Sequence, residues 1–100
     1  MLDAARKARE FTAGQRKEDL VENEQLRLAV VRLIEIIGEA AGRVELETRQ
    51  RAAHIPWPAI VSMRNRLIHA YFDVDLDRVW ETVTDDLPPL MAQLERLLAE

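Results

Sequence analysis

The chain has 100 residues, of which 48% are hydrophobic and 32% are charged. This length fits one domain spanning residues 1–100, and the composition differs from that of disordered chains. Three glycines, four prolines and 5% aromatic residues are too few for a β-sandwich or barrel, so we expect an all-α protein. The net charge of −4 excludes nucleic-acid binding through overall charge and leaves only a local patch for it.

The absence of cysteine excludes disulfides, thiolate metal sites and cysteine nucleophiles. No apolar run approaches the length of a membrane span, and the first residues carry charges where a signal peptide needs an apolar stretch. We therefore expect a cytoplasmic protein without a membrane partner.

The spacing of apolar residues predicts the helices in the first half of the chain. Residues 2–13 form a weakly amphipathic helix with Gly14 as its stop. Apolar residues then recur every three or four positions over residues 19–41 and predict one long helix, apolar on more than one face. Gly38 and Gly42 have two open interpretations: they allow another helix to approach closely, or they mark the helix end.

The second half of the chain predicts three further segments. After a polar loop or short helix, a third helix opens at Pro56 or Pro58 and runs to about Ala70. Asp75 is a good N-cap for a fourth helix. Asp86, followed by a leucine and two prolines, indicates a second cap or a kink in a continuing helix. Together these elements predict a bundle of four to five helices.

The most informative stretch, residues 63–71, contains two arginines, an amide, an imidazole and a phenol. On a helix, Asn65 and His69 share a face, whereas Arg64 lies about 140° around the axis from His69. One continuous helix would therefore not bring Arg64 and His69 together. Either the helix ends before His69 and turns it back, or two copies related by a two-fold axis combine their groups in one cleft.

Such a group of residues suits phosphoryl transfer on RNA. An imidazole exchanges protons near neutral pH, and an arginine fork holds a phosphate and its developing charge without a metal ion. The structural alternative is that the arginines and the amide cap helices or pair with carboxylates, and that the histidine complements a helix dipole.

The chain resembles the HepT-like branch of the HEPN superfamily, helical proteins of prokaryotic toxin–antitoxin loci. The resemblance rests on the R-x-x-x-x-H signature of Arg64 and His69, with the favoured Asn65 inside it, and on the H-x-Y extension to Tyr71. The flanking blocks are in register over roughly residues 20 to 100: residues 36–40, 55–57, 63–69, 75–80 and 86–90.

The resemblance implies a HEPN-type helical homodimer that acts as a metal-independent endoribonuclease toxin, without a cofactor. Arg64 would contact the scissile phosphate, His69 would transfer protons, and Asn65 would orient one of them. The implied partners are the RNA substrate and a cognate minimal nucleotidyltransferase antitoxin of the MntA-like type. In some systems that antitoxin transfers AMP to the tyrosine of the H-x-Y element, which is Tyr71 here. Phosphates added there would neutralise the arginine cleft.

Two features depart from the family pattern. The N-terminal helix is several residues shorter than in similar proteins, so we expect a trimmed first helix or an internal start at Met1. Few basic residues surround the motif. Arg66 is a candidate phosphate contact, and the other candidates for an RNA-binding patch are Arg51, His54 and Arg78.

Other sites are disfavoured by their residue types. The acidic run at residues 73–77 resembles a calcium loop, but it has arginine where the loop needs glycine and threonine where it needs glutamate. Zinc-ligand spacing and phosphate-binding glycine loops are also absent. We interpret Trp57 and Trp80 as core residues, and Glu35 and Glu39 as solvated or paired with Arg32 or Arg43.

Two functions from different classes therefore stay open beside a plain helical assembly module. The first is a ribonuclease toxin whose cleft forms on dimerisation. The second is a non-catalytic dimer that serves as binding partner and AMPylation substrate of a nucleotidyltransferase, with Tyr71 as the modified residue.

Overall fold

The computed structural model describes residues 1–70 and 73–100, and of residues 68–70 the backbone. The all-α fold expected from composition and periodicity is confirmed, and a short two-stranded antiparallel pairing is added to it. The elements in chain order are α1 Leu2–Thr12, α2 Lys17–Glu22, α3 Glu24–Gly42, α4 Leu46–Arg51, α5 Trp57–Val61, α6 Met63–Leu67, β1 Ile68–Ala70, β2 Asp73–Val74, α7 Leu76–Glu81, the π-helical turn η1 Thr82–Asp86 and α8 Leu87–Leu98.

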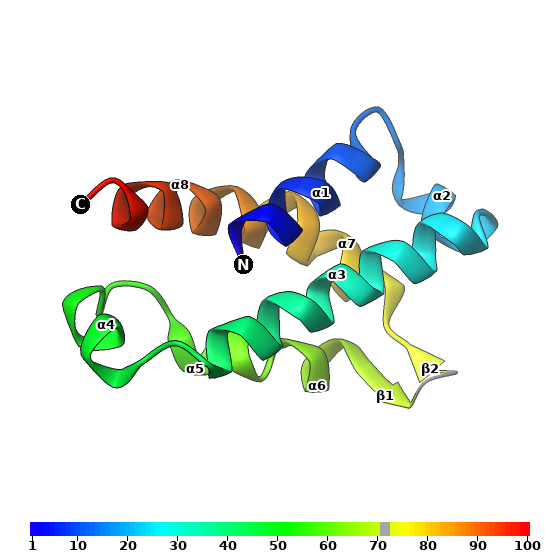
Figure 1. The fold of residues 1–100 in the computed structure, drawn as a ribbon. Coiled ribbons are helices and arrows are strands. Elements are labelled where there is room, and N and C mark those ends of the chain that lie inside the picture. The colour runs from blue at the N-terminus through cyan, green and yellow to red at the C-terminus, as the bar shows by residue number, and fades with distance from the viewer. Residues whose placement is uncertain (71–72) are drawn as a thin grey trace.

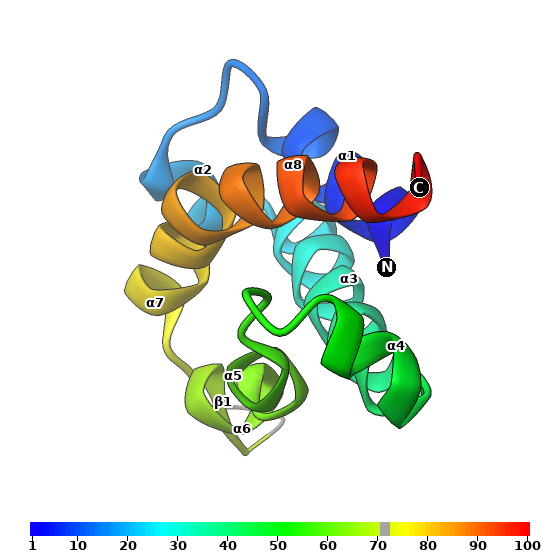
Figure 2. The same ribbon diagram turned by 90° about the vertical axis from the view of Figure 1, so that its left-hand side faces the viewer.

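Helix α3 is the centre of the molecule (Figure 1), and it packs against α1 and α2 and against α5 and α6. Helices α1 and α8 lie side by side on one side of α3, whereas α5 and α6 lie on the other (Figure 2). The core between them is aliphatic, and its largest fully buried side chains are Leu20, Val30, Ile34, Ile37, Ile55, Val79, Val83 and Leu87. In the part of the chain that the structure describes, no helix is long and apolar enough to cross a membrane.

The long helix predicted over residues 19–41 is wrong in one respect, because the chain breaks at Asn23. Its backbone leaves the helical region, and its side chain accepts a hydrogen bond from the Leu26 N–H at 3.1 Å as the N-cap of α3. The helix predicted over residues 2–13 is confirmed as α1, and Gly14 follows it with φ +74°, a conformation that favours glycine. The polar segment after α3 contains the short helix α4.

The two glycines of α3 have different roles. A Cβ on Gly38 would lie 3.3 Å from the Ile60 carbonyl oxygen and 3.5 Å from that of Val61, so Gly38 lets α5 approach closely. No described atom lies within 4 Å of the corresponding position at Gly42, where α3 ends. Each interpretation offered for this pair is therefore confirmed at one of the two glycines.

The helix predicted from Pro56 or Pro58 to Ala70 is wrong in its length and continuity. The chain is helical over α5, breaks at Ser62 and resumes as α6. The Ser62 hydroxyl donates to the carbonyl oxygens of Pro58 and Ala59, at 3.0 and 3.3 Å, and so competes for acceptors at the end of α5.

Helix α6 then ends at Leu67, because its carbonyl accepts from the Asp75 N–H at 2.9 Å and the intervening chain pairs as β1 and β2.

Asp75 is confirmed as the N-cap of α7, since its carboxylate accepts from the Arg78 N–H at 3.1 Å. At Asp86 the helix continues: this residue has helical dihedral angles, and its side chain makes no capping hydrogen bond. The interpretation of Asp86 as a second cap is therefore wrong. A π-helical turn, Thr82–Asp86, joins α7 to α8, and Pro88 and Pro89 lie in the first turn of α8, where an absent N–H costs least.

Candidate active site and adjacent pocket

Helix α6 is five residues long and carries both arginines of the motif on different sides. Arg64 and Arg66 are two positions apart, which places their side chains about 200° apart around the axis. The Arg64 Nε lies 3.7 Å from Glu35 Oε1 on α3. The Arg66 Nη2 donates to the Ala59 carbonyl oxygen of α5 at 2.7 Å. One short helix thus presents one guanidinium toward α3 and the other toward α5.

The carboxylate of Glu35 bridges two arginines. Its Oε2 lies 3.2 Å from Arg32 Nη1, and the same Arg32 atom lies 3.5 Å from Glu39 Oε1. The expected pairing of Glu35 and Glu39 with Arg32 is confirmed. The pairing of Arg64 with Glu35 agrees with the structural alternative, in which the motif arginines pair with carboxylates, although the sequence did not identify Glu35 as the partner. The ion pair with Glu35 holds the Arg64 guanidinium against α3. The Arg64 side chain is nevertheless 50% exposed, so a phosphate can reach it from solvent.

The remaining motif residues follow Arg64 along the chain. Asn65 is exposed, and its backbone N–H donates to the Ser62 carbonyl at 3.0 Å. The backbone of His69 lies in the middle of β1. The shared helical face predicted for Asn65 and His69 is therefore wrong, because α6 ends at Leu67. The helix does end before His69, which is the first condition of one of the two interpretations offered for bringing Arg64 and His69 together. Tyr71 lies outside the described residues.

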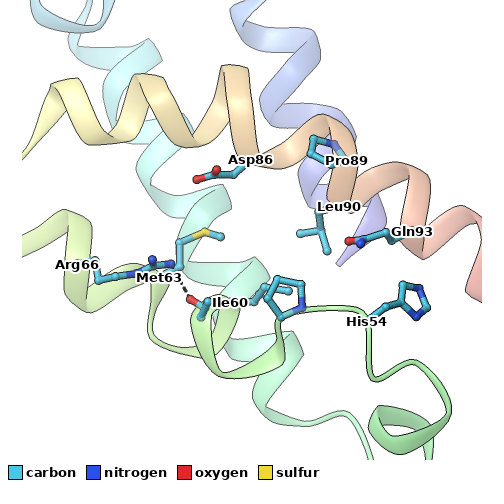
Figure 3. Close-up of a pocket in the computed structure, with 10 residues that line it drawn as sticks. His54, Ile60, Met63, Arg66, Asp86, Pro89, Leu90 and Gln93 are labelled. Atoms are coloured by element: carbon cyan, nitrogen blue, oxygen red, sulfur yellow. Dashed lines mark hydrogen bonds between the residues drawn. The ribbon is translucent and has the colours of Figure 1, made fainter.

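A pocket of about 390 Å³ lies between α5 and α6 on one side and η1 and α8 on the other (Figure 3). It brings together His54 and Arg66, two of the basic residues singled out in the sequence. Asp86 and Gln93 line the same pocket and were missed as site residues. Nothing in the sequence places residues 54 and 66 beside residues 86 and 93, because these residues come to line one pocket only in the tertiary arrangement of α5 and α6 opposite η1 and α8.

Trp57 is confirmed as a core residue. It is buried, its Nε1–H donates to the Ala52 carbonyl at 3.1 Å, and the Arg49 guanidinium lies 6.0 Å from its ring centroid. Trp80 is partly buried and packs against the core, in line with the same interpretation. The Trp57 indole is therefore not available to stack on a base.

The acidic residues near β2 also have structural roles. Asp75 caps α7, and the Asp77 carboxylate lies 3.2 Å from Lys17 Nζ. Among the side chains that the structure describes, those of residues 1–67 and 73–100, no group of three or more His, Asp or Glu is arranged to hold a metal ion.

Comparisons with known proteins agree with the sequence motif. The family described as "Ribonuclease HepT-like" matches residues 1–97. "Probable ribonuclease HepT" of Thermococcus cleftensis is 40% identical over 88 residues, which cover 88% of this chain and 80% of that protein. "Putative RNase MJ1216" of Methanocaldococcus jannaschii is 36% identical over 90 residues, which cover 90% of this chain and 74% of that protein.

No solved structure gives a significant match. The family match nevertheless extends over nearly the whole chain and includes α6 with its two arginines. With an all-α fold and the R-x-x-x-x-H signature in place, the chain belongs to the HepT-like ribonuclease family.

Proposed function

We propose that the protein is a metal-independent endoribonuclease, the toxin component of a prokaryotic toxin–antitoxin system. The observation that carries this proposal is the geometry around α6. Arg64 is half exposed on this short helix, and the helix ends two residues before His69. Family membership supports the reaction class, since the relatives are named as ribonucleases.

In the proposed reaction, RNA supplies its own nucleophile. His69 takes the proton of a 2′-hydroxyl, the 2′-oxygen bonds to the adjacent phosphorus, and the bond from phosphorus to the 5′-oxygen breaks. A second imidazole gives a proton to the leaving 5′-oxygen. The Arg64 guanidinium offers paired donors to the charged phosphate, and Asn65 orients one of the two groups. The products are a 2′,3′-cyclic phosphate and a 5′-hydroxyl.

We place the active cleft between two copies of the chain, because the reaction needs a base and an acid and each copy supplies one His69. The exposed face of α3 is the proposed contact. Leu28 lies seven residues before Glu35, so both project from one face of the helix. The Leu28 side chain is 60% exposed, so its burial against a second copy would remove apolar surface from water.

Mixing the wild type with an inactive variant tests the composite site. The His69→Ala homodimer should fail to cleave RNA. After wild-type and His69→Ala chains are unfolded and refolded together, each heterodimer carries a single His69, so the activity per wild-type chain should fall as the heterodimer fraction rises. Arg96→Ala, which removes an exposed arginine of α8 outside the motif, replaces His69→Ala in the control mixture and should leave the activity per wild-type chain unchanged. A constant activity per wild-type chain in the His69→Ala mixture, with heterodimers present by mass, would contradict a shared cleft.

The proposed partner is a cognate minimal nucleotidyltransferase antitoxin of the MntA-like type, and Tyr71 is the proposed AMP acceptor. This part of the proposal rests on the H-x-Y extension of the motif. The partner and ATP should add the mass of AMP to the wild-type chain and none to Tyr71→Phe. If the purified wild type leaves RNA intact while this modification proceeds, the protein is instead the non-catalytic binding partner and AMPylation substrate of the nucleotidyltransferase.

A further inference from the structure

The pocket between α5 and α8 has apolar walls and a polar rim. Its inner surface comes from Ile60, Met63 and Leu90, which are themselves nearly buried, with proline rings at its sides. The volume of about 390 Å³ lies within the range of sites that bind small molecules. These apolar walls suit an aromatic ring. The faces of such a ring form no hydrogen bonds, so their burial against apolar side chains is more favourable than their exposure to water.

The rim carries one cation and one carboxylate on facing walls. Figure 3 shows Asp86 on the wall formed by η1 and Arg66 on the wall formed by α6. Arg66 is fixed by its hydrogen bond to the Ala59 carbonyl oxygen at 2.7 Å, which leaves the other guanidinium donors available. Among the residues that the structure describes, no ion pair or hydrogen bond engages the Asp86 carboxylate.

The two opposite charges on the rim restrict the kind of ligand. The Asp86 carboxylate would repel a simple anion, and the Arg66 guanidinium would repel a simple cation. A nucleotide satisfies both, because its base has N–H donors and its phosphate is an anion. Among the four RNA bases, guanine offers two adjacent donors, N1–H and the 2-amino group, and these match the two oxygens of one carboxylate. The Gln93 carboxamide, on the next turns of α8, can donate to or accept from the remaining base edge.

We propose that this pocket is the subsite for one guanosine nucleotide of the RNA strand that Arg64 contacts. Asp86 accepts from the Watson–Crick edge of guanine, and Arg66 binds a phosphate of the same strand. This inference rests on the proposed ribonuclease function for its role in cleavage. Binding of the nucleotide itself does not depend on catalysis.

The first test is binding of guanosine 5′-monophosphate to the full chain, followed by amide shifts in ¹H–¹⁵N NMR. We expect shifts to concentrate in residues 54–66 and 86–93 and binding of the other three monophosphates to be at least several-fold weaker. Asp86→Asn should weaken guanosine monophosphate binding by roughly tenfold, since it replaces one acceptor of a charged pair with a donor.

Asp85→Asn is the matched control. It removes the same charge one residue away, outside the pocket, where the Asp85 carboxylate accepts from the Thr84 hydroxyl at 3.3 Å. This variant should bind guanosine monophosphate like the wild type. Arg66→Gln should weaken all four monophosphates while leaving binding of the uncharged nucleoside guanosine unchanged. Equal binding of the four monophosphates, or equal effects of Asp86→Asn and Asp85→Asn, would overturn the proposal.

Cleavage assays separate this inference from the ribonuclease proposal. Arg64→Ala should lose cleavage and keep guanosine monophosphate binding, because Arg64 does not line the pocket. If the wild type cleaves RNA and ignores guanosine monophosphate, the subsite is wrong and the ribonuclease stands. If binding depends on Asp86 while no RNA is cleaved, the ribonuclease is wrong and the nucleotide pocket stands.

Discussion

Glu35 and Arg64 form an ion pair between α3 and α6, with 3.7 Å from Oε1 to Nε. The pair connects the long central helix to the short helix that carries the candidate catalytic arginine. It also means that an RNA phosphate and Glu35 compete for the same guanidinium. Because the Arg64 side chain is 50% exposed, solvent screens the pair, so its effect on folding is small and its effect on RNA binding is the larger one.

We therefore predict that Glu35→Gln lowers the KM for RNA several-fold, because Arg64 loses its competing carboxylate. The free energy of unfolding should change by no more than about 0.5 kcal/mol. Steady-state cleavage kinetics and thermal unfolding measure the two effects. Glu39→Gln is the control, since Glu39 pairs with Arg32 and not with Arg64, and its KM should stay near that of the wild type. An unchanged or higher KM for Glu35→Gln would contradict the competition.

Leu28→Glu should dissociate the proposed dimer. The substitution places a charge on the exposed face of α3, and its desolvation would oppose burial against a second copy. We expect a monomer by light scattering, unchanged helicity by circular dichroism and loss of RNA cleavage. Leu46→Glu is the matched control on α4, where the leucine is 69% exposed. A dimeric, fully active Leu28→Glu variant would place the interface elsewhere.

Gly38→Ala should destabilise the protein by about 1 kcal/mol, although alanine is the better helix former. The new methyl group would press against the Ile60 carbonyl oxygen at 3.3 Å, and α5 would have to shift. Gly42→Ala meets no described atom within 4 Å and should be neutral or slightly stabilising. Urea unfolding of both variants measures the difference. Equal effects would mean that α5 moves away at no cost.

Asn23→Ala should cost about 1 kcal/mol of unfolding free energy, because the first turn of α3 loses its capping acceptor. Gln25→Ala, two positions later on an exposed part of α3, provides the comparison and should be close to neutral. Chemical unfolding followed by circular dichroism distinguishes the two. A neutral Asn23→Ala would show that α2 and α3 are separated by packing alone.

Local patterns predicted the elements that depend on local physics. Periodicity gave α1, and Asp75 was identified as a cap because its side chain satisfies its own helix. The breaks at Asn23 and Ser62 were missed because apolar periodicity continues through both positions while a single side chain redirects the backbone. Helix α6 ends where the Leu67 carbonyl accepts from the Asp75 N–H, eight residues away. The residues around Leu67 contain no helix-stop signal from which this end could be predicted.

The residues of the candidate site also fall into two groups, those that the sequence predicts and those that only the tertiary structure reveals. The motif predicts Arg64, Asn65 and His69 as site residues from their types and spacing alone. It does not predict Asp86 and Gln93, because they line a pocket only in the tertiary arrangement of α8 opposite α5 and α6. Pairing of the motif arginines with carboxylates was predicted, but Glu35 as the partner of Arg64 was not: 29 positions separate the two residues in the sequence, and the packing of α6 on α3 brings them together.

The decisive measurement is cleavage of RNA by the purified wild type and by His69→Ala with a chelator present. We expect cleavage by the wild type alone, with 2′,3′-cyclic phosphate ends on the products and the same dimer mass and helicity for both proteins. Cleavage by His69→Ala at the wild-type rate, or loss of wild-type cleavage on adding the chelator, would contradict a metal-independent ribonuclease that uses His69.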